Sequence, residues 1–149
     1  MDLKSIQDLL KEKYNKSINE YIEGINETNI GYLIPYTMFM IGQVHIWHLL
    51  CTSGQKHSAL GDFYDSLVEG IDELSEMYIG QGGMILESDP FKYSNKYEIG
   101  TILNQVDGYR QIISSTIESC GEAQLKSLQD ALIDIQENVD AFKYKFNLD

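Results

Sequence analysis

The chain has 149 residues, 43% hydrophobic and 23% charged, and its 11 basic and 23 acidic side chains give it a net charge of −12. This composition predicts one globular domain, and no stretch approaches the roughly 18 to 20 unbroken apolar residues that a membrane span needs. Such an acidic surface repels phosphate backbones and anionic lipid, so we expect a preference for cations and no direct binding to nucleic acid or membranes.

The first predicted element, over residues 2–24, is an amphipathic helix whose apolar residues recur at helical spacing. It is weaker than the helices that follow, and we interpret residues 1–25 as an N-terminal helical extension. An apolar segment then runs from about Thr28 to Leu50. Pro35 either kinks this segment or lies near its true start, because proline has no N–H to donate inside a helix.

Three apolar stripes with steps of three and four residues predict three more helices. The first begins after Gly54, and the last two are separated by Gly121, a residue suited to a short turn between antiparallel helices. The stripes consist of Leu60, Phe63 or Tyr64, Leu67, Ile71, Leu74 and Tyr78; of Ile99, Leu103, Val106, Tyr109, Ile113, Ile117 and Cys120; and of Leu125, Leu128, Leu132, Ile135, Val139, Phe142 and Phe146.

The connections predict how four main helices, over residues 27–147, are arranged. The first and third connections, at about 52–56 and 120–122, are short, whereas the middle one, from Gly80 to Ser94, is long. A helix of about 24 residues is about 36 Å long, and roughly fifteen residues at up to about 3.3 Å each can cross that length. We expect a long crossover that makes the second and third helices parallel, which is the ferritin-like four-helix topology. A disordered loop in an ordinary bundle is the alternative.

The two cysteines, Cys51 and Cys120, lie at opposite ends of this predicted bundle, so no intrachain disulfide is expected. They form no CxxC pair, and the first five residues lack the basic-then-apolar pattern of a secretion signal. We therefore expect reduced thiols, a single domain over residues 1–149 and a cytoplasmic location.

All three histidines, His45, His48 and His57, fall within thirteen residues of each other. Imidazole is a good ligand for iron and other first-row metals, although a single helical histidine is more often a packed or capping residue. The Glu-x-x-His pattern of di-iron bundles is absent, since glycine or histidine precedes each histidine by three positions. A di-iron site within one subunit is therefore not expected.

Two carboxylates follow the histidines at a regular spacing. His57 is twelve residues after His45, Asp72 is fifteen after His57, and Glu76 is four after Asp72, so that both carboxylates project from one helix face. This set resembles, in order and spacing, the ferroxidase site of the Dps-like mini-ferritins. Trp47 is similar to the tryptophan beside that family's metal site, one residue later than usual, and Gly82-Gly83 resembles the family's helix end. The resemblance extends over residues 28–146, but its specific part is 45–83.

The resemblance implies a cage, dodecameric in that family, with metal sites at its two-fold interfaces. One subunit would supply His45 and His57, and its partner would supply Asp72 and Glu76. Iron is the expected metal: Fe²⁺ would be oxidised by peroxide or oxygen and stored in the cavity. His48, one turn from His45, is a candidate auxiliary ligand, with a packing role as the alternative.

The sequence also departs from the family's pattern. The family often has an acidic residue four positions after the second histidine, but here that residue is Gly61. Asp62 is next to it, about 100° around the helix, so a second iron is expected to bind through it weakly or through water. The family's DNA binding commonly uses a lysine-rich tail, whereas residues 1–24 carry four lysines and five acids. DNA binding is therefore not carried over.

An acidic stripe accompanies the predicted carboxylate ligands along the same helix: Asp62, Asp65, Glu69, Asp72 and Glu76. It is either a solvated face or the lining of a cage interior that concentrates cations. Two other functions stay open beside iron oxidation. The first is a ferritin-like structural or interaction subunit with weak iron chemistry, which Gly61 favours, and the second is a monomeric helical adaptor.

Overall fold

The structure is a computed structural model that describes the backbone of residues 2–148 and their side chains, except those of residues 14–17. The described residues contain no β-strand, which confirms the predicted all-α class. They form five helices: α1 (Leu3–Asn26), α2 (Ile30–Leu50), α3 (Gly54–Gly80), α4 (Ile99–Glu122) and α5 (Lys126–Phe146). Within this part of the chain, no helix combines the length and apolar character that crossing a membrane requires.

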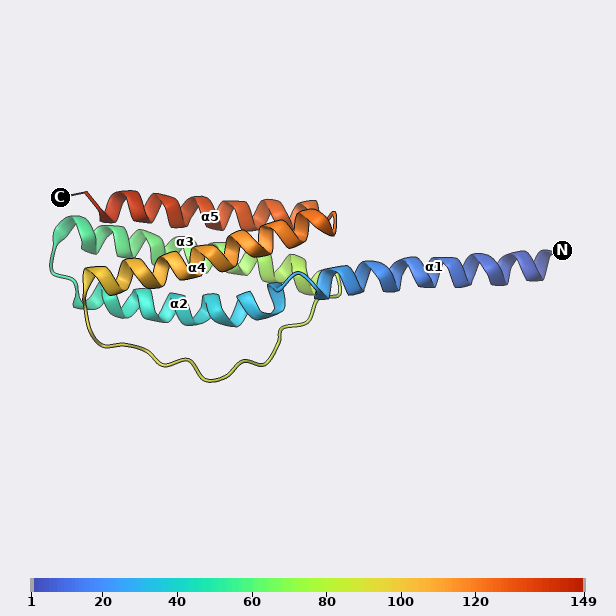
Figure 1. Ribbon diagram of the computed structural model, residues 1–149, viewed down its shortest axis with the longest axis horizontal. Coiled ribbons are helices and arrows are strands. Elements are labelled where there is room, and N and C mark those ends of the chain that lie inside the picture. Colours follow the sequence, from blue (N-terminus) through green and yellow to red (C-terminus); the bar gives the residue numbers. More distant parts are fainter. Residues whose placement is uncertain (1, 149) are drawn as a thin grey trace.

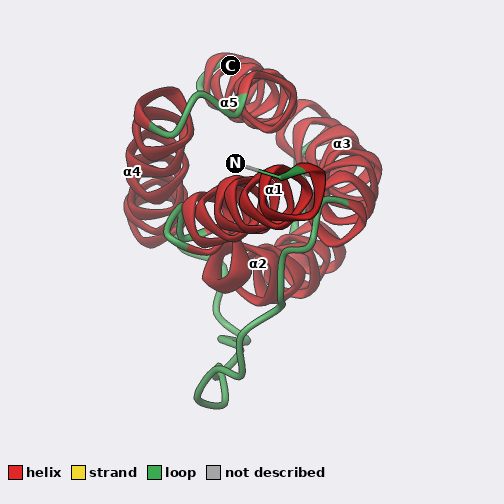
Figure 2. Cartoon of the chain, turned by 90° about the vertical axis from the view of Figure 1, so that its right-hand side faces the viewer, coloured by secondary structure: helices red, strands yellow, loops and turns green. Residues whose placement is uncertain are grey.

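Helices α2 to α5 pack side by side around one core, and most of α1 projects beyond one end of the bundle (Figure 1; Figure 2). Helix α3 packs against both α2 and α5, and α4 packs against α5. Helices α3 and α4 point the same way along the bundle, whereas α2 and α5 point the opposite way (Figure 1). The two short connections, residues 51–53 and 123–125, therefore lie at opposite ends of the bundle.

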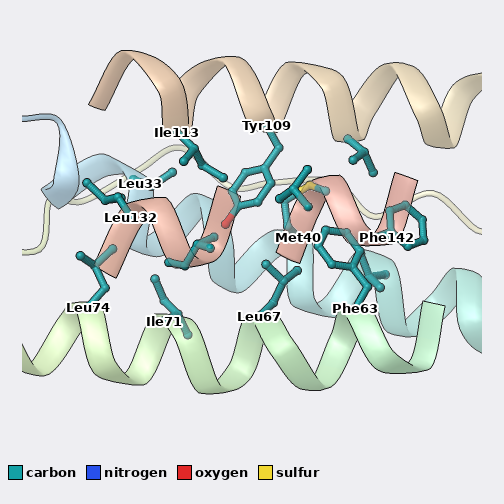
Figure 3. Close-up of a cluster of buried hydrophobic side chains, with 14 of the residues drawn as sticks. Leu33, Met40, Phe63, Leu67, Ile71, Leu74, Tyr109, Ile113, Leu132 and Phe142 are labelled. Atoms are coloured by element: carbon teal, nitrogen blue, oxygen red, sulfur yellow. The ribbon is translucent and has the colours of Figure 1, made fainter. Parts of the chain in front are cut away.

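The core is built from the three predicted apolar stripes of α3 to α5 and from buried side chains of the apolar segment that forms α2 (Figure 3). Burial of these side chains is the main force that holds the helices together, because it removes apolar surface from water. The side chains with no more than 3% exposure that Figure 3 labels are Leu33, Met40, Phe63, Leu67, Ile71, Leu74, Tyr109, Ile113, Leu132 and Phe142.

Helix α1 contacts the bundle near its C-terminal end. Ile25 is fully buried, and the Tyr21 hydroxyl donates a 2.9 Å hydrogen bond to Oε1 of Gln81. Asn29 then adopts a left-handed conformation, with φ of 66°, which separates α1 from α2. Further out, apolar side chains are 38% to 71% exposed: Leu3, Ile6, Leu9, Leu10 and Ile18.

Pro35 lies inside α2 and anchors the long connection, residues 81–98. Because Pro35 has no N–H, the carbonyl of Gly31 lacks its usual helical donor, and the N–H of Leu86 donates to it instead at 2.9 Å. Gly31 permits this close approach, since a Cβ there would lie 2.5 Å from the carbonyl oxygen of Met84. The sequence left two possibilities for Pro35, and the structure shows it within the helix.

Further along α2, the same connection is held by side chains. The amide of Gln43 forms two hydrogen bonds with the backbone of Ser94, one accepted from N–H at 2.7 Å and one donated to C=O at 3.0 Å. The ring of Phe39 stacks between those of Phe91 and Tyr93, at centroid distances of 4.8 and 5.1 Å. Residues 81–98 therefore follow α2 along its length rather than forming a free loop (Figure 1).

The turn between α4 and α5 differs from the sequence-based prediction. Gly121 was expected to separate the two helices, but α4 continues through Glu122, and Gln124 takes the left-handed conformation with φ of 59°. The N–H of Leu125 then reaches back to the carbonyl of Cys120 at 2.9 Å. The helix ends where its last carbonyls find donors, and a glycine is not needed for this.

Candidate functional site

The three histidines gather where the C-terminal end of α2 meets the N-terminal end of α3. His45 and His48 lie one turn apart on α2, with ring centroids 6.2 Å apart, and His57 lies in the first turn of α3. The ring of Tyr64 on α3 is 4.6 Å from that of His45. His45 and His57 are exposed and His48 is half-buried, so the cluster is open to solvent.

His48 and His57 form a reciprocal pair, which we call the histidine clasp. Their rings stack with centroids 3.9 Å apart and 25° between the planes. Nδ1 of each ring lies 2.9 Å from the main-chain oxygen of the other residue, and Nδ1 of His57 is also 3.1 Å from the oxygen of Cys51. A carbonyl oxygen only accepts, so Nδ1 carries the proton in both rings. In the neutral form, Nε2 of each ring therefore has a free lone pair, as a metal ligand requires.

The histidine clasp forms because the C-terminal end of α2 needs hydrogen-bond donors. The last helical hydrogen bond of α2 runs from the Cys51 N–H to the Trp47 carbonyl, so the carbonyls from His48 onward need other donors. The Nδ1–H group of His57 supplies one to His48 and to Cys51. Beside it, the thiol of Cys51 lies 3.3 Å from the Tyr97 hydroxyl. Burial, together with this thiol, raises the pKa of Tyr97 above its ordinary value of 10.0, so Tyr97 stays protonated at neutral pH.

Within one chain, the structure does not bring the predicted carboxylate ligands to the histidines. Asp72 and Glu76 are exposed on α3, and Asp72 lies about 22 Å along the helix axis from His57 and about 60° around it. Among the described residues, no group of three or more His, Cys, Asp and Glu side chains is arranged to hold a metal ion.

Two other residues singled out in the sequence point elsewhere. Asp62 forms an ion pair with Lys145 of α5, with 2.5 Å between Oδ2 and Nζ, and lies about 140° around α3 from His57. Its carboxylate is directed toward α5, and its role as a weak ligand of a second iron stays a prediction. Trp47 is 1% exposed in the core, whereas His45 is exposed, so the indole does not lie on the histidine side of α2.

Sequence reasoning treated Gly61 as a missing ligand and overlooked its contact with His48. A Cβ at position 61 would lie 2.9 Å from Cε1 of His48 and 3.3 Å from its Nδ1. The His48 imidazole therefore occupies the space that a side chain at position 61 would need. A glycine in the middle of an amphipathic helix was the available signal, because it costs helix stability without an evident turn.

Comparison with known proteins gives one family. A family model described as a family of unknown function, DUF5856, matches residues 48–146. The chain belongs to DUF5856. No curated protein and no solved structure matches the chain. The DUF5856 match covers all of α3, α4 and α5 and includes the histidine clasp, Asp72 and Glu76, but it begins after His45. Because the DUF5856 description carries no activity, any function for the chain has to be argued from its own residues.

Proposed function

We propose that the protein is a ferritin-like, Dps-like ferroxidase, whose subunits assemble into a cage and oxidise Fe²⁺ at sites shared between two chains. One observation carries this proposal. His57 and Asp72 both lie on the outward side of α3 but are about 22 Å apart along it. Histidines and carboxylates of one chain are too far apart to share an ion, whereas those of two antiparallel copies are not.

A two-fold axis makes this geometry concrete. In a symmetric dimer the same surface of each copy faces the other, and the two α3 helices can run antiparallel. An axis that crosses α3 near residues 64–66, midway between His57 and Asp72, sets His57 opposite Asp72 of the partner subunit. Symmetry then creates two equivalent sites for each dimer.

Exposed apolar residues on α2 support an interface on this face. Met38 and Leu49 are 53% and 68% exposed and lie on the same side of α2 as His45. A partner packed on this side of α2 would cover both side chains. The course of residues 81–98 along α2, with α3 and α4 pointing the same way, supports the ferritin-like topology.

The ligand set suits the proposed substrate. His45 and His57 offer nitrogen and the carboxylates offer hard oxygen, a combination that binds Fe²⁺. Each bound Fe²⁺ gives up one electron. Two electrons and two protons convert one hydrogen peroxide into two waters, and four of each convert one O₂ into two waters. The Fe³⁺ formed is held by the carboxylates before it moves on. The net charge of −12 draws cations toward the protein.

The second candidate function is a ferritin-like structural or protein-interaction subunit with little iron chemistry. The lack of a complete metal-binding group within the described part of one chain favours it. The two functions differ in Fe²⁺ oxidation. A ferroxidase accelerates it with peroxide or oxygen, whereas a structural subunit assembles and leaves Fe²⁺ oxidation at the rate of buffer.

The deciding experiment measures Fe²⁺ oxidation by size-fractionated protein and by two variants, His45→Ala/His57→Ala and Asp72→Asn/Glu76→Gln. Each variant alone should fall to the buffer rate. Co-expressed, they should recover about a quarter of the normal number of sites, because half of randomly paired dimers are mixed and each mixed dimer has one intact site of two. Glu73→Gln, at an exposed position of α3 beside Asp72 that carries no proposed ligand, is the matched control and should keep full activity. If the co-expressed variants recover no Fe²⁺ oxidation, the shared site is rejected. If the unaltered protein itself oxidises Fe²⁺ only at the rate of buffer, the structural subunit is favoured.

A further inference from the structure

His48 lies against the proposed ligand His57, and Gly61 lies against His48. The ring of His48 stacks on that of His57, and the main-chain oxygen of His48 accepts the Nδ1–H hydrogen bond of His57 at 2.9 Å. Both contacts fix the orientation of the His57 ring. The hydrogen bond also fixes its tautomer, which leaves Nε2 unprotonated and available to a metal ion.

Gly61 is what allows the His48 ring to lie there. Its missing Cβ would be 2.9 Å from Cε1 of His48, and real Cβ atoms essentially never come that close to another heavy atom. Gly61 and His57 are one turn apart on α3, so a side chain at position 61 would push the His48 ring away from His57. The absence of a side chain at position 61 and the stacked position of His48 are thus two parts of one arrangement.

We propose that His48 is the positioning residue of the metal site and that Gly61 is required to admit it. The inference rests on the proposed function in that it takes His57 as a metal ligand. His48 does not itself bind the ion. It holds His57 so that Nε2 accepts a divalent first-row transition cation, in the way that a hydrogen-bonded neighbour orients and strengthens a ligating histidine.

The test uses Zn²⁺, which binds imidazole and carboxylate ligands without redox chemistry. Isothermal titration calorimetry compares the full-length protein with Gly61→Ala and with Gly108→Ala, a matched control in α4 whose added Cβ meets nothing within 4 Å. We expect Gly61→Ala to bind Zn²⁺ about 2-fold to 10-fold more weakly, because it loses the stacked His48 ring but keeps the main-chain hydrogen bonds of His57. Gly108→Ala should bind as the unaltered protein does. Equal affinity for Gly61→Ala and the unaltered protein would overturn the inference.

Variants at position 48 distinguish positioning from ligation. His48→Ala should weaken Zn²⁺ binding, and adding Gly61→Ala to it should have no further effect, because no ring remains to be displaced. His48→Phe keeps a ring to stack on His57 but has no nitrogen, so it should bind Zn²⁺ more tightly than His48→Ala. If His48→Phe is as weak as His48→Ala, His48 is a ligand rather than a positioning residue, and the inference fails.

A second measurement needs neither metal nor activity. NMR of the metal-free protein should show His57 as the Nδ1–H tautomer in the unaltered protein and in both glycine variants, because its acceptors are main-chain oxygens. The chemical shifts of the carbon-bound His57 ring protons report the stacked His48 ring. They should change in Gly61→Ala but not in Gly108→Ala, and unchanged shifts in Gly61→Ala would overturn the inference. The Nε2–H tautomer in the unaltered protein would overturn the inference, as would the absence of Zn²⁺ binding. Zn²⁺ binding that depends on Gly61, together with Fe²⁺ oxidation at the buffer rate, would reject only the ferroxidase function.

Discussion

The hydroxyls of Thr37 and Tyr109 form a 2.8 Å hydrogen bond inside the core, and neither residue is exposed. Burial raises the pKa of Tyr109 above its ordinary value, so the phenol remains neutral and can keep this bond. We expect Tyr109→Phe to lower the free energy of unfolding by about 1 kcal/mol, because the Thr37 hydroxyl loses its partner. Urea denaturation measures the change. A variant as stable as the unaltered protein would show that the bond contributes nothing.

Cys120 gives a pH-dependent prediction. Burial raises the pKa of its thiol from 9.0 to about 11. Since the unfolded chain releases this proton at lower pH than the folded one, the free energy of unfolding should fall as the pH rises from 9.0 to about 11. The loss amounts to about 3 kcal/mol at most. Denaturation over this pH range should show a shallower fall for Cys120→Ala. Tyr97 and Tyr109 are present in both proteins and contribute equally to the pH dependence of each. Equal slopes of unfolding free energy against pH would therefore mean that Cys120 contributes nothing.

At the scale of the element, glycines in helices differ in what they tolerate. Gly31→Ala should destabilise the protein, because its Cβ would lie 2.5 Å from the Met84 carbonyl oxygen. The added Cβ of Gly108→Ala has no neighbour within 4 Å, so this variant should stabilise α4 by up to about 1 kcal/mol. Thermal unfolding followed by circular dichroism compares the two. If both variants were stabilised, the connection at 81–98 would not be held against α2.

The helices themselves were largely predictable, because stripes such as Leu125 to Phe146 recur with the period of the helix that buries them. The turn at Gln124 was not, since the backbone there follows the closing contacts of two helices rather than a local glycine. The same holds for the site. Spacing drew attention to His45 and His57, but the relation between His48 and Gly61 crosses from α2 to α3 and exists only in the packed structure.

At the scale of the whole molecule, α1 is the least integrated part. Deleting residues 2–19 removes apolar side chains that are mostly solvent-exposed, whereas Tyr21 and Ile25, which contact the bundle, remain. We expect the melting temperature to change by less than about 4 °C, equivalent to 1 kcal/mol. We also expect copies of the protein to associate more weakly, because the deletion removes the exposed apolar side chains of α1. Calorimetry and sedimentation velocity measure the two effects. A cooperative loss of the bundle's structure would mean that α1 belongs to its core.

The proline in α2 has a consequence for exchange of backbone protons with solvent. Residues 81–98 have no regular secondary structure beyond their first turn, yet the N–H of Leu86 is bonded to the Gly31 carbonyl that Pro35 leaves open, and the N–H of Ser94 to Gln43. These two hydrogens can exchange for deuterium only when the connection lifts from α2. Leu86 and Ser94 thus act as paired reporters, one near the start of α2 and one in its second half, of whether the connection opens at one place or along its whole length.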